Sequence, residues 1–166
     1  MKELLFLVII SLLLQGCTSK IEIPVSHAGV VIHDEHVKTL VLRPGEHLVS
    51  FGTRVIIYDV SQAILDSEFD FYFEDFSKGK LNVAIEFTPI VDSLSSFYRK
   101  YQSIYVTTVI EIITQQIVRD LFKNVKPNEF TKQEFELKII KAIIENDRFT
   151  NYVNVKRVDI VDLRFD

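Results

Sequence analysis

Short apolar runs rich in β-branched residues, separated by polar turns, follow one another between residues 27 and 60, which is typical of β-strands. The β-branched runs at 27–32 and 37–42 flank the polar segment 33–36, and together they predict a β-hairpin with a short loop. A turn containing Pro and Gly follows at 43–46, because proline fixes φ and glycine accepts a positive φ. The run 54–60 is then expected to form the next strand.

Two longer strands are predicted further along the chain. Segment 68–74 places its phenylalanines on one face and its acidic residues on the other, which indicates a strand with one buried face and one wet face. A turn at 77–80 leads into an alternating strand at 81–88. Pro89 is expected to end that strand, because proline donates no backbone hydrogen bond.

After Pro89 the apolar period changes to the 3.6-residue spacing of helices. Ser93 is expected to cap a short helix that runs through Tyr101, and the apolar positions between 106 and 121 predict an amphipathic helix. A further helix starts at a capping-box pattern, in which Thr131 and Glu134 each satisfy a free backbone N–H group.

Val153–Leu163 is predicted to be the last strand. Its apolar residues fall on both faces, so we expect it to be interior or bulged and not a simple edge strand. Strands, then helices, then one strand predict an α+β fold, with a mixed, mostly antiparallel sheet covered by helices on one side. We expect one such domain, at residues 23–166.

The chain begins with a pattern typical of a secretory signal. Lys2 precedes an apolar run, Leu4–Leu14, that is too short to span a bilayer as a helix. The tetrad Leu14–Cys17 resembles the lipobox of bacterial lipoproteins, although Gln15 stands where a small residue is usual. We therefore expect residues 1–16 to be removed and residues 17–22 to form a lipidated polar tether. An ordinary signal peptide with an incidental cysteine is the alternative.

Net charge and cysteine content limit the classes of binding partner that the sequence supports. The formal net charge is −4 and the chain contains no long basic run, which argues against nucleic acid as a partner. Cys17 is the one cysteine of the chain, so a disulfide within the monomer is excluded and a lipidated thiol explains its presence. Acyl chains on this sulfur would give a stable lipid anchor, since each buried CH₂ contributes about 0.8 kcal/mol.

The histidines are candidate metal ligands. All four lie close together in the sequence, at His27, His33, His36 and His47. Imidazoles with the neighbouring Asp34 and Glu35 are suitable ligands for zinc or copper, and a hairpin could bring three of them together. Their spacing matches none of the compact ligand motifs, so a solvated turn and ordinary strand positions are favoured. We expect no metal and no cofactor.

Acidic residues are the candidate catalytic groups of the sequence. A group of carboxylates around the expected strand at 68–74 could supply the acid pair of a glycosidase: Asp66, Glu68, Asp70, Glu74 and Asp75. An exposed strand face whose charges discourage edge pairing explains them better. The sequence contains no phosphate loop, dinucleotide fingerprint, nucleophile elbow or zinc-protease helix motif. We therefore expect no catalytic residues.

Features spread along the whole chain resemble one family in their order and spacing. They are Pro24, Gly29, Val30 and Val31; Leu42, Arg43, Pro44, Gly45, Glu46 and His47; Tyr58 and Asp59; Gly79; Tyr101; Val118, Arg119 and Asp120; and Val155–Leu163. The chain thereby resembles the SPFH or band 7 domain, which stomatins, prohibitins and flotillins share. The turn at Leu42–His47 is similar to the L-x-P-G-x-H turn of that family.

The resemblance implies a non-catalytic domain beside a membrane that acts as a scaffold or regulator of membrane-protein assemblies. Its implied partners are the membrane, other membrane or envelope proteins and further copies of itself in a homo-oligomer. Family members usually continue into a coiled coil, whereas no heptads follow the last strand here, so we expect no large cage. A lipid on Cys17 would replace the usual transmembrane segment.

The expected location is the bacterial cell envelope. Thr18 after the cysteine favours the outer over the inner membrane, by analogy with bacterial sorting rules. The alternative function is an envelope lipoprotein that binds a soluble ligand or stabilises an envelope complex without self-association. For either function, a group of aromatic residues is a candidate contact patch: Tyr98, Tyr101, Tyr105, Phe149 and Tyr152.

Overall fold

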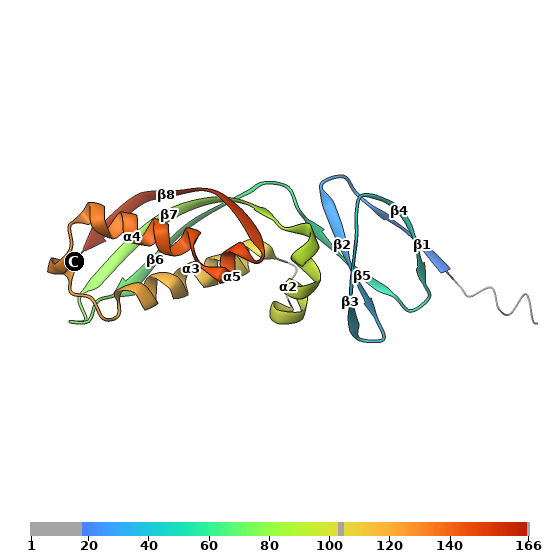
Figure 1. Cartoon of the computed structure of the whole chain (residues 1–166), viewed down its shortest axis with the longest axis horizontal. Helices are drawn as coiled ribbons and strands as arrows, with labels where there is room; N and C mark the ends of the chain where they lie inside the picture. Colours follow the sequence, from blue (N-terminus) through green and yellow to red (C-terminus); the bar gives the residue numbers. More distant parts are fainter. Residues whose placement is uncertain (1–17, 103–104, 166) are drawn as a thin grey trace, which may run out of the picture.

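The computed structural model describes residues 18–102 and 105–165 and has the expected α+β class (Figure 1). The strands are β1 (Thr18–Ile23), β2 (His27–His33), β3 (His36–Leu42), β4 (Gly45–Ser50), β5 (Arg54–Asp59), β6 (Ala63–Tyr72), β7 (Lys78–Pro89) and β8 (Val153–Phe165). The helices are η1 (Val91–Ser93), α2 (Leu94–Tyr101), α3 (Val106–Phe122), η2 (Pro127–Glu129), α4 (Lys132–Ile144) and α5 (Asp147–Thr150), of which η1 and η2 are 3₁₀ turns. The signal-like segment and Cys17 lie outside the described residues.

The strands form three antiparallel sheets and not the single sheet expected from the sequence. Their orders are β1-β4, β3-β2-β5 and β6-β7-β8. The first two sheets make an N-terminal lobe, residues 18–60, and the third sheet with its helices makes a C-terminal lobe, residues 63–165. The lobes follow one another along the long axis of the molecule, so β1 and the end of β8 lie at opposite ends (Figure 1).

Two predictions about the N-terminal lobe are wrong. Segment 18–22, expected to be a tether, belongs to strand β1, and β4 follows the turn at 43–46 where no strand was expected. The two strands pair from Thr18 opposite Ser50 to Ile23 opposite Gly45. Three polar residues at the start of β1 look like a linker when read alone, and only the pairing with β4 makes them a strand.

The hairpin of β2 and β3 is confirmed. His33 pairs with His36, which leaves Asp34 and Glu35 as a two-residue loop. Their φ angles are 47° and 64°. Positive φ at both central positions is the mark of a type I′ turn, whose twist matches that of the flanking strands.

The buried face of β6 is confirmed, although the strand starts earlier than expected. Phe69, Phe71 and Phe73 are 7%, 0% and 3% exposed. The turn into β7 also comes earlier, because Phe73 N donates to Ser77 O at 3.0 Å and Ser77 N donates to the Asp75 carboxylate at 3.0 Å. β7 ends at Pro89, as expected.

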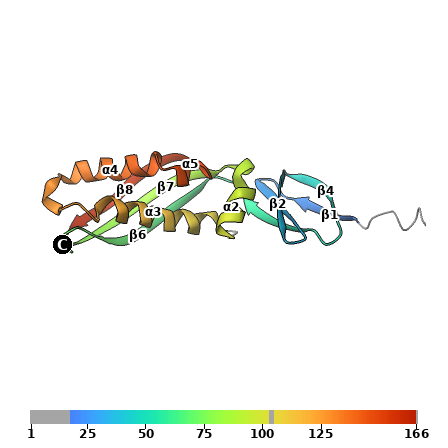
Figure 2. The ribbon, with the colours of Figure 1, turned by 60° about the horizontal axis from the view of Figure 1, so that its bottom comes forward.

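Helices α3 and α4 cover one face of the third sheet, as Figure 2 shows. Aromatic rings from both layers meet there: Phe71 stacks on Phe122 at 4.8 Å between centroids, and Phe135 lies 5.0 Å from Phe122 and 5.1 Å from Phe165. The capping box of α4 is confirmed, since Glu134 N donates to Thr131 Oγ1 at 3.3 Å and Thr131 N donates to Glu134 Oε2 at 2.7 Å.

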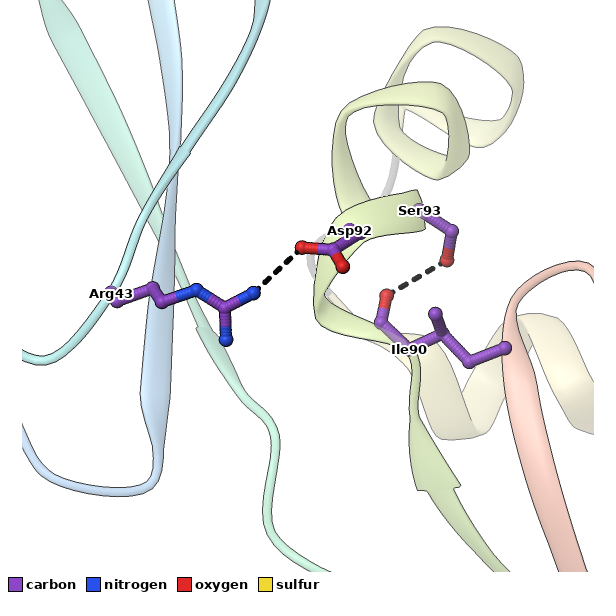
Figure 3. Close-up of polar contacts among 4 residues, drawn as sticks. All are labelled: Arg43, Ile90, Asp92 and Ser93. Atoms are coloured by element: carbon purple, nitrogen blue, oxygen red, sulfur yellow. Dashed lines mark hydrogen bonds and ion pairs between the residues drawn. The ribbon is translucent and has the colours of Figure 1, made fainter.

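The remaining differences concern element ends. Ser93 is the N-cap residue of α2, and the helix ends at Tyr101, as expected. The Ser93 side chain does not cap the helix, however, because the hydroxyl donates to Ile90 O at 2.8 Å and accepts no hydrogen bond from α2 (Figure 3). Among the strands of the described residues, β8 pairs with β7 alone and is an edge strand. The expected bulges are present. The register between β7 and β8 shifts twice, between Asn82 and Val83 of β7 and again between Glu86 and Phe87 of β7. The short α5 was not predicted.

Candidate membrane-facing end and lobe junction

The chain enters the described structure beside an exposed apolar turn. Thr18 lies opposite Ser50, the last residue of β4, at the end of the molecule farthest from the helices (Figure 1). Thr53 N donates to Ser50 O at 3.1 Å and closes the turn, and Gly52 has a φ of +81° that a side chain would strain. Phe51 in this turn is 76% exposed. A large aromatic side chain therefore faces solvent beside the point where the described chain begins.

Leu48 of β4, three residues before Phe51, is a second exposed apolar side chain. It is 74% exposed and its strand is tied to β1 by the ion pair of Lys20 Nζ and Glu46 Oε1, at 2.6 Å. We name Leu48 and Phe51 the apolar tip. No periodic pattern in the sequence identified them, because their strand was itself not predicted.

The structure does not describe Cys17, the one predicted site residue, so lipidation stays a prediction. Within residues 18–102 and 105–165, none of the helices combines the length and the apolar character that crossing a membrane requires.

Three of the histidines are held in turns and strands of the N-terminal lobe. His27 Nδ1 lies 3.0 Å from Val25 O, His47 Nε2 lies 2.7 Å from Arg43 O, and His33 Nδ1 lies 3.0 Å from Thr53 Oγ1. The described residues contain no group of three or more His, Cys, Asp or Glu that could hold a metal ion. The contacts of His27 and His47 are with backbone carbonyl groups two and four residues away, whereas His33 contacts the side chain of Thr53 on a neighbouring segment.

Carboxylates on the outer face of β6 are paired with lysines of β7. Lys80 Nζ lies 2.6 Å from Glu68 Oε1, and Lys78 Nζ lies 2.9 Å from Asp70 Oδ2. Each pair crosses the two strands diagonally. The arrangement is a ladder of ion pairs on an open sheet face, which differs from two carboxylates placed across a cleft.

The second feature of the molecule is the junction between the lobes, where arginines make three contacts. Arg43 Nη2 lies 2.9 Å from Asp92 Oδ1, as Figure 3 shows. Arg54 Nη2 donates to Tyr98 Oη at 3.2 Å, and Arg99 Nη2 donates to Val37 O at 3.1 Å. The partners are 44 to 62 residues apart in the sequence, so no local pattern could have paired them.

Beneath these polar contacts the junction is apolar. Tyr58 of β5 is 1% exposed and meets Phe97 of α2 edge-to-face, with 6.1 Å between ring centroids. Burial, with a smaller contribution from Tyr98, raises the pKa of Tyr58 to about 12. The two lobes therefore share one core at this point.

A cleft of about 640 Å³ opens beside the junction, between the β2–β3 hairpin and α2. Asp34, Glu35 and His36 of the hairpin line it, together with Arg54 of the neighbouring strand β5 and Arg99 of α2. Its wall thus carries both signs of charge.

The expected aromatic patch is not a single surface. Phe149 is fully buried, and Tyr101 and Tyr152 pack against Phe97 at 5.1 and 5.5 Å between centroids. Tyr105, in contrast, is 65% exposed. Most of these rings therefore belong to the core or its margin.

The fold and its two lobes define an α+β protein. The chain matches the model of the SPFH domain / Band 7 family over residues 21–166, and it belongs to that family. Comparison with the curated proteins gave no match. The resemblance found in the sequence is confirmed, and domains of this family commonly associate with membranes and oligomerise.

Proposed function

We propose that this protein is a lipid-anchored lipoprotein of the bacterial envelope, in which the SPFH domain acts as a non-catalytic scaffold or regulator of membrane-protein assemblies. Family membership supports the association with a membrane. The lipobox-like tetrad ending at Cys17 supports a thioether-linked lipid as the anchor, with residues 1–16 removed. Thr18 after the cysteine favours the outer membrane.

The observation that carries the proposal is the apolar tip beside Thr18. An anchored chain would enter the domain at this end, so Leu48 and Phe51 would face the same bilayer as the acyl chains. Burial of two apolar side chains at the membrane interface would add to the binding free energy of the lipid anchor. It would also orient the molecule with its long axis pointing outward from the membrane surface. The C-terminal lobe would then be presented to neighbouring proteins.

The proposal is tested with the full chain in a bacterial host. Fatty-acid labelling and membrane fractionation are compared for wild type, Cys17→Ser and the double variant Leu48→Ser/Phe51→Ser. We expect Cys17→Ser to lose the label and leave the membrane fraction. The double variant should keep the label and be extracted more readily by high pH or salt. An unlabelled wild-type protein in the soluble fraction would contradict lipid anchoring.

A second candidate function is the binding of a soluble envelope ligand without self-association. The mixed-charge cleft beside Arg54 and Arg99 favours it, because its volume of about 640 Å³ lies in the range of small-molecule sites. Sedimentation of the detergent-solubilised full chain distinguishes the two. A concentration-independent monomer supports the binding protein, whereas self-association supports the scaffold.

A further inference from the structure

A second hollow lies in the C-terminal lobe, on the side of α3 that faces α2 and α5. It has a volume of about 530 Å³. We name it the α3 groove, and the described residues that line it are Lys100, Tyr101, Thr108, Val109, Ile112, Ile113, Gln116 and Arg148. Residues 108 to 116 of α3 form its floor and rise about 12 Å along the helix axis.

The floor of the α3 groove is apolar and incompletely covered. Val109 and Ile113 are 7% and 2% exposed and belong to the core, whereas Ile112 beside them is 49% exposed. These positions recur at helical spacing on one side of α3. The groove therefore offers a strip of side chains that a second apolar helix face can cover.

The rim of the groove is cationic, although the chain as a whole has a net charge of −4. Lys100 comes from the last turn of α2 and lies over the rings of Tyr101 and Tyr152, at 5.1 and 5.6 Å from their centroids. Arg148 comes from α5 and its Nη1 donates to Gln116 Oε1 at 3.1 Å. Among the described residues, neither cation forms an ion pair, and the lining residues include no carboxylate.

The nearest acidic side chains of α3 are engaged elsewhere. Glu111 accepts a hydrogen bond from Ser67 on the sheet side, at 2.7 Å, and Asp120 pairs with Lys123 at 2.9 Å. The hydrogen bond from Lys123 lowers the pKa of Asp120, and Arg148 makes a small further contribution in the same direction. No described carboxylate lies within ion-pair distance of Lys100 or Arg148, however, so both can still pair with a carboxylate from outside the lobe.

We propose that the α3 groove binds an acidic amphipathic helix of a partner protein. Apolar side chains of that helix cover Ile112, and carboxylates on its flanks pair with Lys100 and Arg148. The two cations come from separate elements, α2 and α5. A protein helix can supply one carboxylate to each of them, whereas a fatty acid has a single carboxylate for both, so a helix fits the groove better. This proposal rests on the proposed function in one respect: the partner is taken to be a protein that lies beside the membrane-anchored chain.

The test uses the purified full chain in mild detergent and a fluorescent synthetic helix as the probe. The probe has leucines at helical spacing and glutamates on both flanks, and a second probe has lysines in place of the glutamates. We expect the acidic probe to bind with an anisotropy change that weakens as salt is added, and the basic probe to bind about tenfold more weakly or less.

Matched variants locate the binding surface. Lys100→Glu/Arg148→Glu and, separately, Ile112→Gln should each weaken binding of the acidic probe by about tenfold or more. The control Lys38→Glu/Lys141→Glu makes the same change in net charge at exposed positions outside the groove. The control Leu137→Gln makes the same apolar-to-polar change on α4, where Leu137 is 59% exposed. Both controls should bind like wild type.

Three outcomes would overturn the proposal. They are equal binding of the two probes, binding that the groove variants leave unchanged, and a groove occupied by something else. Palmitate that binds where the acidic probe does not would assign the groove to a lipid. An oligomer that Ile112→Gln dissociates would assign it to a second copy of the chain. Because these measurements do not depend on acylation, they are independent of the Cys17→Ser fractionation that tests the proposed function.

Discussion

At the scale of single residues, Tyr58 makes the stability of the folded protein depend on pH, through its buried position at the lobe junction. Its hydroxyl is neutral in the folded protein up to a pKa of about 12, whereas an exposed tyrosine in the unfolded chain ionises near pH 10. Below about pH 10 the preference for the neutral form contributes fully to stability. Between about pH 10 and 12 only the unfolded state releases the proton, so stability falls as the pH rises.

We expect this residue to contribute about 2–3 kcal/mol to the loss of stability over that range. Urea unfolding of wild type and Tyr58→Phe at a series of pH values measures it, and the variant should lose stability with a shallower slope. Tyr72→Phe, at a position 57% exposed, is the control and should keep the wild-type slope. Equal slopes for wild type and Tyr58→Phe would show that burial of the hydroxyl does not perturb its pKa.

At the scale of elements, two kinds of contact join η1 and α2 to the strands of the N-terminal lobe. The Arg43–Asp92 pair is exposed, with side chains 66% and 82% accessible, and exposed ion pairs contribute about 0–1 kcal/mol. Phe97 is 1% exposed between Tyr58 and Tyr101, and removing a buried phenyl ring costs about 3–5 kcal/mol. The apolar contact thus dominates the junction.

This difference predicts the outcome of two substitutions. Arg43→Ala should lower the free energy of unfolding by about 1 kcal/mol or less, and Phe97→Ala should lower it by about 3 kcal/mol or more. Chemical denaturation with circular dichroism measures both values. A loss from Arg43→Ala as large as that from Phe97→Ala would mean that the ion pair, and not the buried ring, holds the lobes together.

At the scale of the whole molecule, the elongated shape raises the question of whether the lobes unfold separately. Ala28, Val30 and Tyr58 of the N-terminal lobe belong to the same buried cluster as the sheet and helices of the C-terminal lobe. Breaking either lobe therefore exposes apolar surface of the other, which favours a single cooperative transition.

Native-state hydrogen exchange measures this cooperativity. Amides in the middle of β2 and of β7 should open with free energies that agree within about 1 kcal/mol. In Phe97→Ala the two values should separate, with β2 opening at lower free energy, because the shared core is cut at the junction. If the wild-type values already differ by several kcal/mol, the lobes are independent folding units.

Much of the C-terminal lobe could be predicted because its signals are local. The alternation around Phe71 and the helical spacing along α3 each follow from the geometry of a single element. The capping box of Thr131 and Glu134 involves residues three apart, so it too is visible in the sequence. The family resemblance succeeded for a related reason, since it relies on the order of such local features along the whole chain.

The sequence by itself determined the α+β class, most strands and helices and the SPFH family. Only the tertiary structure decided that Thr18–Ile23 is a strand, that Leu48 and Phe51 form an exposed tip beside it, and that Arg43 meets Asp92. The physical reason is the range of the forces involved. Backbone preferences and side-chain periodicity act over a few residues, whereas these three features depend on the pairing of segments that are far apart along the chain and come together only when it folds.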